Sequence, residues 1–99
     1  MAVPSGVVTF LFTDVVGSSS RWDSAAPEMG AAIRRHDELI GAAVSENSGH
    51  LVKSMGDGMM AAFADPADAV SGALAAQSAI ATEEWPAELE GIRVRMGVH

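Results

Sequence analysis

"VKSMGDGMMAAF", residues 52–63, places a Gly-Asp-Gly sequence centred on Asp57 between two short apolar runs. An Asp-Gly pair in this setting is a strong short-range signal for a β-hairpin. We therefore expect "HLVKSM" (50–55) and "MMAAF" (59–63) to form antiparallel strands, with Asp57 in or beside a tight turn.

Two further strands are expected at the two ends of the sequence. "VVTFLF" (7–12) is a continuous β-branched and aromatic run, which predicts a fully buried central strand that ends near Asp14. "IRVRMGV" (92–98) alternates apolar and polar residues. That alternation is typical of a half-exposed strand, here with Arg93 and Arg95 on its outer face.

The remaining segments have helical patterns. Residues 18–47 divide into two pieces, because Pro27 is best placed in the first turn of a second helix. Apolar spacing predicts that this helix buries one stripe, formed by Met29, Ile33, His36, Ile40 and Val44. Another helix is expected to begin with Asp65 as N-cap and Pro66 in its first turn. Its expected apolar face consists of Val70, Ala73, Leu74 and Ile80, and "EWPAELEG" (84–91) is expected to be a loop.

The order β-α-β-β-α-β predicts an α+β, ferredoxin-like fold, with an antiparallel sheet and helices on one face. Ninety-nine residues suffice for one domain with a single core. Right-handed crossovers put the third strand between the first and the second. Asp14 closes the first strand and Asp57 precedes the third, so we expect their carboxylates to meet at one rim of the sheet.

Composition excludes several classes of partner. Thirteen acids against six bases give a formal charge of −7, which repels phosphate backbones and acidic membrane surfaces. The chain has no cysteine, so disulfides and thiolate metal sites are excluded. Its first apolar run is interrupted by Asp14 and lacks a basic start, which fits neither a signal peptide nor a membrane span. We expect a cytoplasmic protein with no nucleic-acid partner and no membrane insertion by this segment.

Two neighbouring carboxylates repel each other unless a proton or a cation lies between them. Carboxylate oxygens, water and substrate phosphate are the usual ligands of Mg²⁺. "VVGSSS" (15–20) adds a turn of small residues that leads into a helix N-terminus, where backbone N–H groups can receive phosphate oxygens. Together these features predict a site for a nucleoside triphosphate and a metal.

The sequence resembles the class III nucleotidyl cyclases over residues 7–99. "FTDVVGSS" (12–19) is similar to the first metal segment of that family, and residues 52–63 are similar to the second. "IRRHDELI" (33–40) and "RVRMGVH" (93–99) also resemble family text. The resemblance implies an adenylate cyclase that converts ATP to cyclic AMP and pyrophosphate by two-metal catalysis, in cyclic-nucleotide signal transduction.

The resemblance also implies the roles of individual residues. Asp14 and Asp57, helped by the backbone carbonyl of Val15, would be the catalytic metal ligands for two Mg²⁺ or Mn²⁺ ions. Gly17, Ser18 and Ser19 match the turn that grips the triphosphate, and Lys53 matches the position that reads the purine. A lysine favours adenine, whose N1 accepts a hydrogen bond, over guanine, whose N1–H needs an acceptor.

Family members build their sites between two cyclase domains, which implies a homodimer or pairing with another cyclase domain. The family pattern continues beyond His99 with a second base-reading residue, an Asn and an Arg. Residues 1–99 are therefore expected to be a single nucleotidyl cyclase catalytic domain whose C-terminal part is missing. The alternative that this leaves open is a non-catalytic, cyclase-like module that binds a nucleotide or a partner.

Structural interpretations of the same residues also remain. Asp57 alone is most simply a turn former, Asp14 an Asx-turn or cap residue, and Lys53 a solvated lysine on an edge strand. A ferredoxin-like domain without any ligand would contain all three. The match of "GDGMMA" (56–61) to a dinucleotide fingerprint is disfavoured, because Asp65 and Pro66 follow too soon for the required helix.

Overall fold

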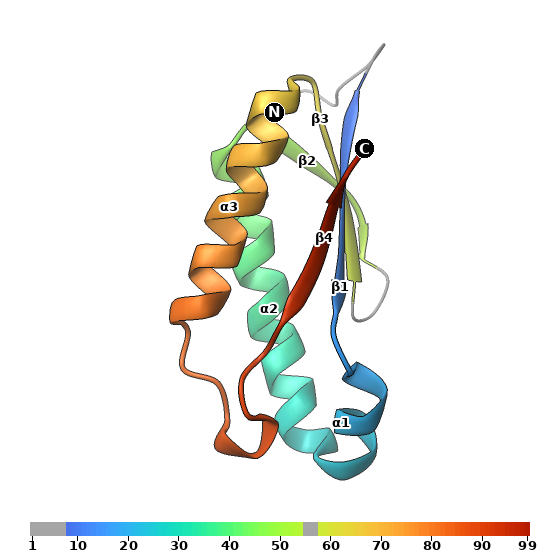
Figure 1. The fold of residues 1–99 in the computed structure, drawn as a ribbon, viewed down its shortest axis with the longest axis vertical. Coiled ribbons are helices and arrows are strands. Elements are labelled where there is room, and N and C mark those ends of the chain that lie inside the picture. Colours follow the sequence, from blue (N-terminus) through green and yellow to red (C-terminus); the bar gives the residue numbers. More distant parts are fainter. Residues whose placement is uncertain (1–7, 55–57) are drawn as a thin grey trace.

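The computed structural model describes residues 8–54 and 58–99 of the chain. Its elements are β1 (Thr9–Val15), α1 (Ser18–Ser24), α2 (Ala26–Glu46), β2 (Gly49–Ser54), β3 (Gly58–Phe63), α3 (Pro66–Thr82), the short 3₁₀ helix η1 (Ala87–Leu89) and β4 (Val94–Val98). The strands form one four-stranded antiparallel sheet in the order β2-β3-β1-β4 (Figure 1). The predicted α+β, ferredoxin-like arrangement is confirmed, including the position of the third strand between the first two.

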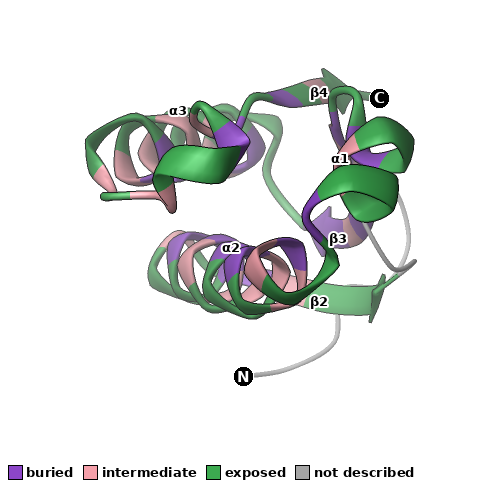
Figure 2. Cartoon of the chain, turned by 90° about the horizontal axis from the view of Figure 1, so that it is seen from below, coloured by how far each residue is buried: buried purple, intermediate pink, exposed green. Residues whose placement is uncertain are grey.

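β1 lies inside the sheet as predicted, but it is not fully buried. Leu11, Thr13 and Val15 are buried, whereas Phe12 between them is 39% exposed. The burial alternates because α2 and α3 both pack on one face of the sheet (Figure 2), and within the described residues the other face carries no long helix. We call this other side the open face. From the strand register it includes Phe12 and Asp14 of β1, Lys53 of β2, Met60 of β3 and Arg95 of β4.

The helix that follows the first strand is broken as expected. α1 and α2 are separate helices, and Pro27 lies in the first turn of α2. The predicted stripe of α2 is also confirmed: four of its members are fully buried and Ile33 packs against the core from a partly buried position. α2 therefore forms one side of the core, under the sheet.

α3 begins as predicted but buries a different face. Asp65 is its N-cap, with a side chain that accepts a hydrogen bond of 2.9 Å from a backbone N–H of the first turn. The expected apolar face is wrong at Val70 and Leu74, which are 48% and 66% exposed. The buried face consists of Ala69, Gly72, Ala76 and Ile80. Small residues let the helix approach the sheet closely: a Cβ atom on Gly72 would lie only 3.1 Å from the ring of Phe63.

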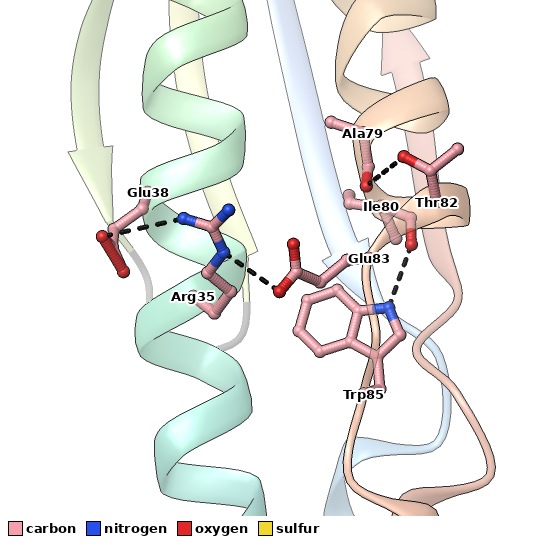
Figure 3. Close-up of polar contacts among 7 residues, drawn as sticks. All are labelled: Arg35, Glu38, Ala79, Ile80, Thr82, Glu83 and Trp85. Carbon is pink, nitrogen blue, oxygen red and sulfur yellow. Dashed lines mark hydrogen bonds and ion pairs between the residues drawn. The ribbon is translucent and has the colours of Figure 1, made fainter.

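Polar contacts join the end of α3 to α2 (Figure 3). The Arg35 Nε atom donates to Glu83 Oε2 at 3.2 Å, and its terminal nitrogen lies 3.9 Å from Glu38 Oε2. The hydrogen bond to Glu83 and the attraction of the same carboxylate raise the pKa of the exposed Arg35 guanidinium above its ordinary value, with a smaller effect from Glu38. The Trp85 indole N–H donates to the Ile80 carbonyl at 2.9 Å. The pair between Arg35 and Glu83 joins α2 to the end of α3 on the helix side of the sheet, and the Trp85 bond ties the following segment to the last turn of α3.

The segment between α3 and β4 is the expected loop, interrupted by η1, whose Leu89 is buried in the core. β4 begins at Val94, so Arg93 lies just before the strand and only Arg95 is part of it. In the ranges 8–54 and 58–99, none of the helices combines the length and the apolar character that crossing a membrane requires.

Candidate functional site

Asp14 lies near the end of β1 on the open face. Its Cα partners are Gly58 of β3 on one side and Arg95 of β4 on the other. The Asp14 side chain is 46% exposed, and its Oδ2 atom contacts the guanidinium of Arg95. Gly58 directly follows Asp57 in the sequence, but Asp57 itself lies outside the described residues. The meeting of the two carboxylates therefore stays a prediction.

The junction between β1 and the start of β3 is tightly built. A Cβ atom on Gly58 would lie 2.5 Å from the backbone oxygen of Thr13, a distance that real side chains essentially never show. The buried Thr13 hydroxyl accepts a hydrogen bond of 3.0 Å from the Met59 N–H. The second glycine of the Gly-Asp-Gly sequence thus lets the two strands pair directly beside Asp14, and Thr13 holds β3 in this register.

A sharp turn follows β1. Val15 is buried, and the next residue, Val16, donates its N–H to the Arg93 carbonyl at 2.9 Å. Gly17 then adopts a left-handed conformation with φ 67°, and α1 starts at the following residue. The Ser18 side chain is buried, while Ser19 is exposed. The three predicted phosphate-binding residues are therefore consecutive in a strand-to-helix turn beside Asp14.

Lys53 is exposed on β2, the strand at one edge of the sheet. It lies opposite Met60 of β3, which in turn lies opposite Phe12 of β1. A register shift between Leu51 and Lys53 interrupts the ladder just before it. Lys53 and Asp14 thus occur on the same face of one sheet. β2 and β3 pair as the two arms of the predicted hairpin, whose turn at 55–57 lies outside the described residues.

Sequence reasoning missed Arg95 as a member of this site. It placed the residue on an outer face but did not bring it to Asp14, because a contact between β1 and β4 depends on the register of two strands that are far apart in the sequence. Thr13 was also missed. A threonine placed between the apolar run 7–12 and the candidate acid was the available signal.

Within residues 8–54 and 58–99, no three His, Asp or Glu side chains gather in a way that would hold a metal.

A hollow in the surface does not belong to this site. It has a volume of about 260 Å³ and lies between α2 and β2, where its lining includes Val44, Gly49 and Leu51. It is at the start of β2 and on the helix side, so it is remote from Asp14.

Comparison with known proteins connects the chain to one family. Residues 2–99 match the adenylate and guanylate cyclase catalytic domain. The chain is 32% identical over 117 residues to an adenylate cyclase of Lachancea kluyveri, covering 100% of this chain and 6% of that protein. It is 30% identical over 114 residues to an adenylate cyclase of Podospora anserina, with 97% of this chain and 5% of that protein covered. The chain thus spans only a small part of these relatives.

Solved structures share its fold. A structure of adenylate cyclases from Trypanosoma brucei in their monomeric state has a TM-score of 0.91 at 24% identity, covering 100% of this chain and 58% of that chain. The guanylate cyclase domain of RhGC from Catenaria anguillulae, in complex with GTP, has a TM-score of 0.81 at 20% identity, covering 92% of this chain and 54% of that chain. Because the family match runs from residue 2 to residue 99 and the fold agrees with these solved domains, the chain belongs to the family of adenylate and guanylate cyclase catalytic domains.

Proposed function

We propose that this domain is an adenylate cyclase domain, which converts ATP to cyclic AMP and pyrophosphate at a site shared between two cyclase domains. ATP is an intracellular substrate, so the proposal places the domain in the cytoplasm. The product, cyclic AMP, places it in cyclic-nucleotide signal transduction. The curated relatives named as adenylate cyclases, at 32% and 30% identity, support adenine as the base.

The observation that carries this proposal is the register at the end of β1. Asp14 is exposed on the open face and lies opposite Gly58, the residue that follows Asp57 in the sequence. Gly58 approaches the Thr13 backbone so closely that this pairing requires a glycine. The register therefore supports a site in which the carboxylates of Asp14 and Asp57 act together.

The residues fit a hard divalent cation. Asp14 and Asp57 would supply carboxylate oxygens and Val15 its backbone carbonyl, which are the ligand types that Mg²⁺ and Mn²⁺ prefer. The Asp14 side chain is 46% exposed, so its carboxylate is open to an ion from solution. Two such ions, when bound, would lower the pKa of the ribose 3′-hydroxyl and offset the charge of the phosphates.

Other residues would bind and orient the substrate. Backbone N–H groups of Gly17, Ser18 and Ser19 would donate to triphosphate oxygens, and the left-handed Gly17 opens the turn for this approach. Because the Ser18 side chain is buried, its contribution would come from the main chain. The Lys53 ammonium would donate to adenine N1.

The open face would serve as the surface for the second domain. It exposes Phe12 and Lys53, and the described residues leave it without a covering helix. In a head-to-tail pair, Lys53 of one domain would read the base of the nucleotide whose phosphates lie at Asp14 of the other. A homodimer satisfies this arrangement, as does pairing with another cyclase domain.

The test is a product assay. The domain is incubated with ATP or GTP and Mn²⁺ or Mg²⁺, and cyclic nucleotide and pyrophosphate are quantified. We expect cyclic AMP from the wild type and its loss in Asp14→Asn and Asp57→Asn. Lys53→Glu should shift the preference toward GTP, because glutamate accepts a hydrogen bond from guanine N1–H.

Asp68→Asn is the matched control, since it removes one carboxylate from α3 on the helix side of the sheet. It should leave product formation unchanged. If the wild type binds ATP with Mn²⁺ but forms no cyclic nucleotide, the domain is the non-catalytic, nucleotide-binding module instead. If the wild type neither binds nor converts a nucleotide, the adenylate cyclase assignment fails.

A further inference from the structure

The ion pair between Asp14 and Arg95 lies at the centre of the candidate site. The two residues are directly paired between β1 and β4, and both side chains lie on the open face. The guanidinium contacts Asp14 Oδ2, the atom type through which a carboxylate also binds a metal. Nothing in the proposed function accounts for this contact.

A guanidinium and a divalent cation compete for such a carboxylate. Arg95 uses lone pairs of Asp14 Oδ2 that a metal would otherwise coordinate, and its positive charge repels an incoming ion. The Arg95 side chain is 74% exposed, and among the described residues it has no other polar partner. It can therefore swing away into water without breaking a second interaction.

We propose that Arg95 is a built-in counter-cation for Asp14, which neutralises the carboxylate in the metal-free domain and which an incoming divalent cation must displace. This inference rests on the proposed function in that Asp14 acts as a metal ligand. Its consequence is a resting domain with a weaker affinity for free metal than its carboxylates alone would give.

The chain contains a matched control for this idea. Arg93 lies just before β4, two residues from Arg95, and its side chain is also exposed. Its backbone carbonyl accepts a hydrogen bond from the Val16 N–H, and this hydrogen bond does not depend on the Arg93 side chain. Arg93→Gln and Arg95→Gln therefore remove the same charge from the same end of the sheet, and only the second removes the contact with Asp14.

The experiment measures Mn²⁺ binding without nucleotide, by electron paramagnetic resonance of free Mn²⁺ at low salt. Exposed ion pairs are worth up to about a fivefold change in an equilibrium constant, and charge repulsion adds to this. We expect Arg95→Gln to bind Mn²⁺ about three- to tenfold more tightly than the wild type. Arg93→Gln should stay within about twofold of the wild type, and the advantage of Arg95→Gln should shrink with added salt.

Asp14→Asn distinguishes a failure of the counter-cation proposal from a failure of the metal site itself. If Asp14→Asn weakens Mn²⁺ binding while Arg95→Gln binds no more tightly than the wild type or Arg93→Gln, the counter-cation proposal is wrong and the metal site stands. If Asp14→Asn binds as the wild type does, or if neither the wild type nor Arg95→Gln binds Mn²⁺ up to about 10 mM, both proposals fail. Thermal melting of every variant excludes loss of folding as the cause.

Discussion

Gly58→Ala tests the junction that brings β3 to Asp14. The added Cβ atom would lie 2.5 Å from the backbone oxygen of Thr13, whereas a tolerated carbon–oxygen contact is about 3.3 Å. Because a backbone atom cannot rotate away, the strands must separate locally by roughly 0.8 Å. Overpacking of this kind costs about 3 kcal/mol, and the usual gain of alanine over glycine in a strand returns up to about 1 kcal/mol. We expect a net loss of about 2 kcal/mol.

Urea unfolding followed by circular dichroism measures this loss, which corresponds to a fall in Tm on the order of 10 °C for a domain of this size. Gly97→Ala is the matched control, because Gly97 of β4 also pairs with β1 and a Cβ atom there would meet nothing within 4 Å. That variant should be unchanged or up to about 1 kcal/mol more stable. Equal stability of the two variants would refute the close approach of β3 and β1.

Three further predictions concern the core. Thr13→Val should cost about 1–3 kcal/mol in urea unfolding, because the buried Met59 N–H loses its acceptor, and an unchanged midpoint would contradict this role. His36→Leu should change stability by less than about 1 kcal/mol, because removing the buried Nε2, which has no partner in the described residues, offsets the loss of the 2.9 Å contact between His36 Nδ1 and Asp37 Oδ1; a loss of several kcal/mol would contradict this. Leu74→Gln should change stability by less than about 0.5 kcal/mol, whereas Ile80→Ala should cost about 2–5 kcal/mol; a comparable loss at both residues would support the apolar face expected from the sequence.

Local signals in the sequence predicted the elements and their order. Pro27 marks the start of α2, and Asp65 caps α3, because the backbone restrictions of proline and the capping bond act over a few residues. The chain order of the elements then allowed only a few topologies, and β3 was correctly placed between β1 and β2.

The buried face of α3 could not be found in this way. Size and hydrophobicity favoured Val70 and Leu74, yet both are exposed, since the helix packs against Phe63 through small residues instead. Which face of a helix is small enough for close contact depends on the opposing strand. The same limit applies to β1, whose apolar run suggested two covered faces although the described residues cover only one.

The sequence predicted the residues of the site and one part of its geometry, the meeting of Asp14 and Asp57, which stays a prediction because Asp57 lies outside the described residues. Asp14 and its neighbouring turn have the expected positions at the end of β1, because strand ends and glycine turns are local features. The contact between Asp14 and Arg95 depends on the register of β1 against β4, which packing of the whole domain decides. Arg95 therefore could not be assigned to the site from the sequence.

The shared metal site can be observed in a crystal structure of the domain with Mn²⁺ and a non-hydrolysable ATP analogue, in which the anomalous signal locates Mn²⁺. We expect an ion coordinated at about 2.1 Å by carboxylate oxygens of both Asp14 and Asp57, next to the triphosphate. An ion held without either carboxylate, or carboxylates more than about 8 Å apart with the nucleotide bound elsewhere, would contradict the shared metal site.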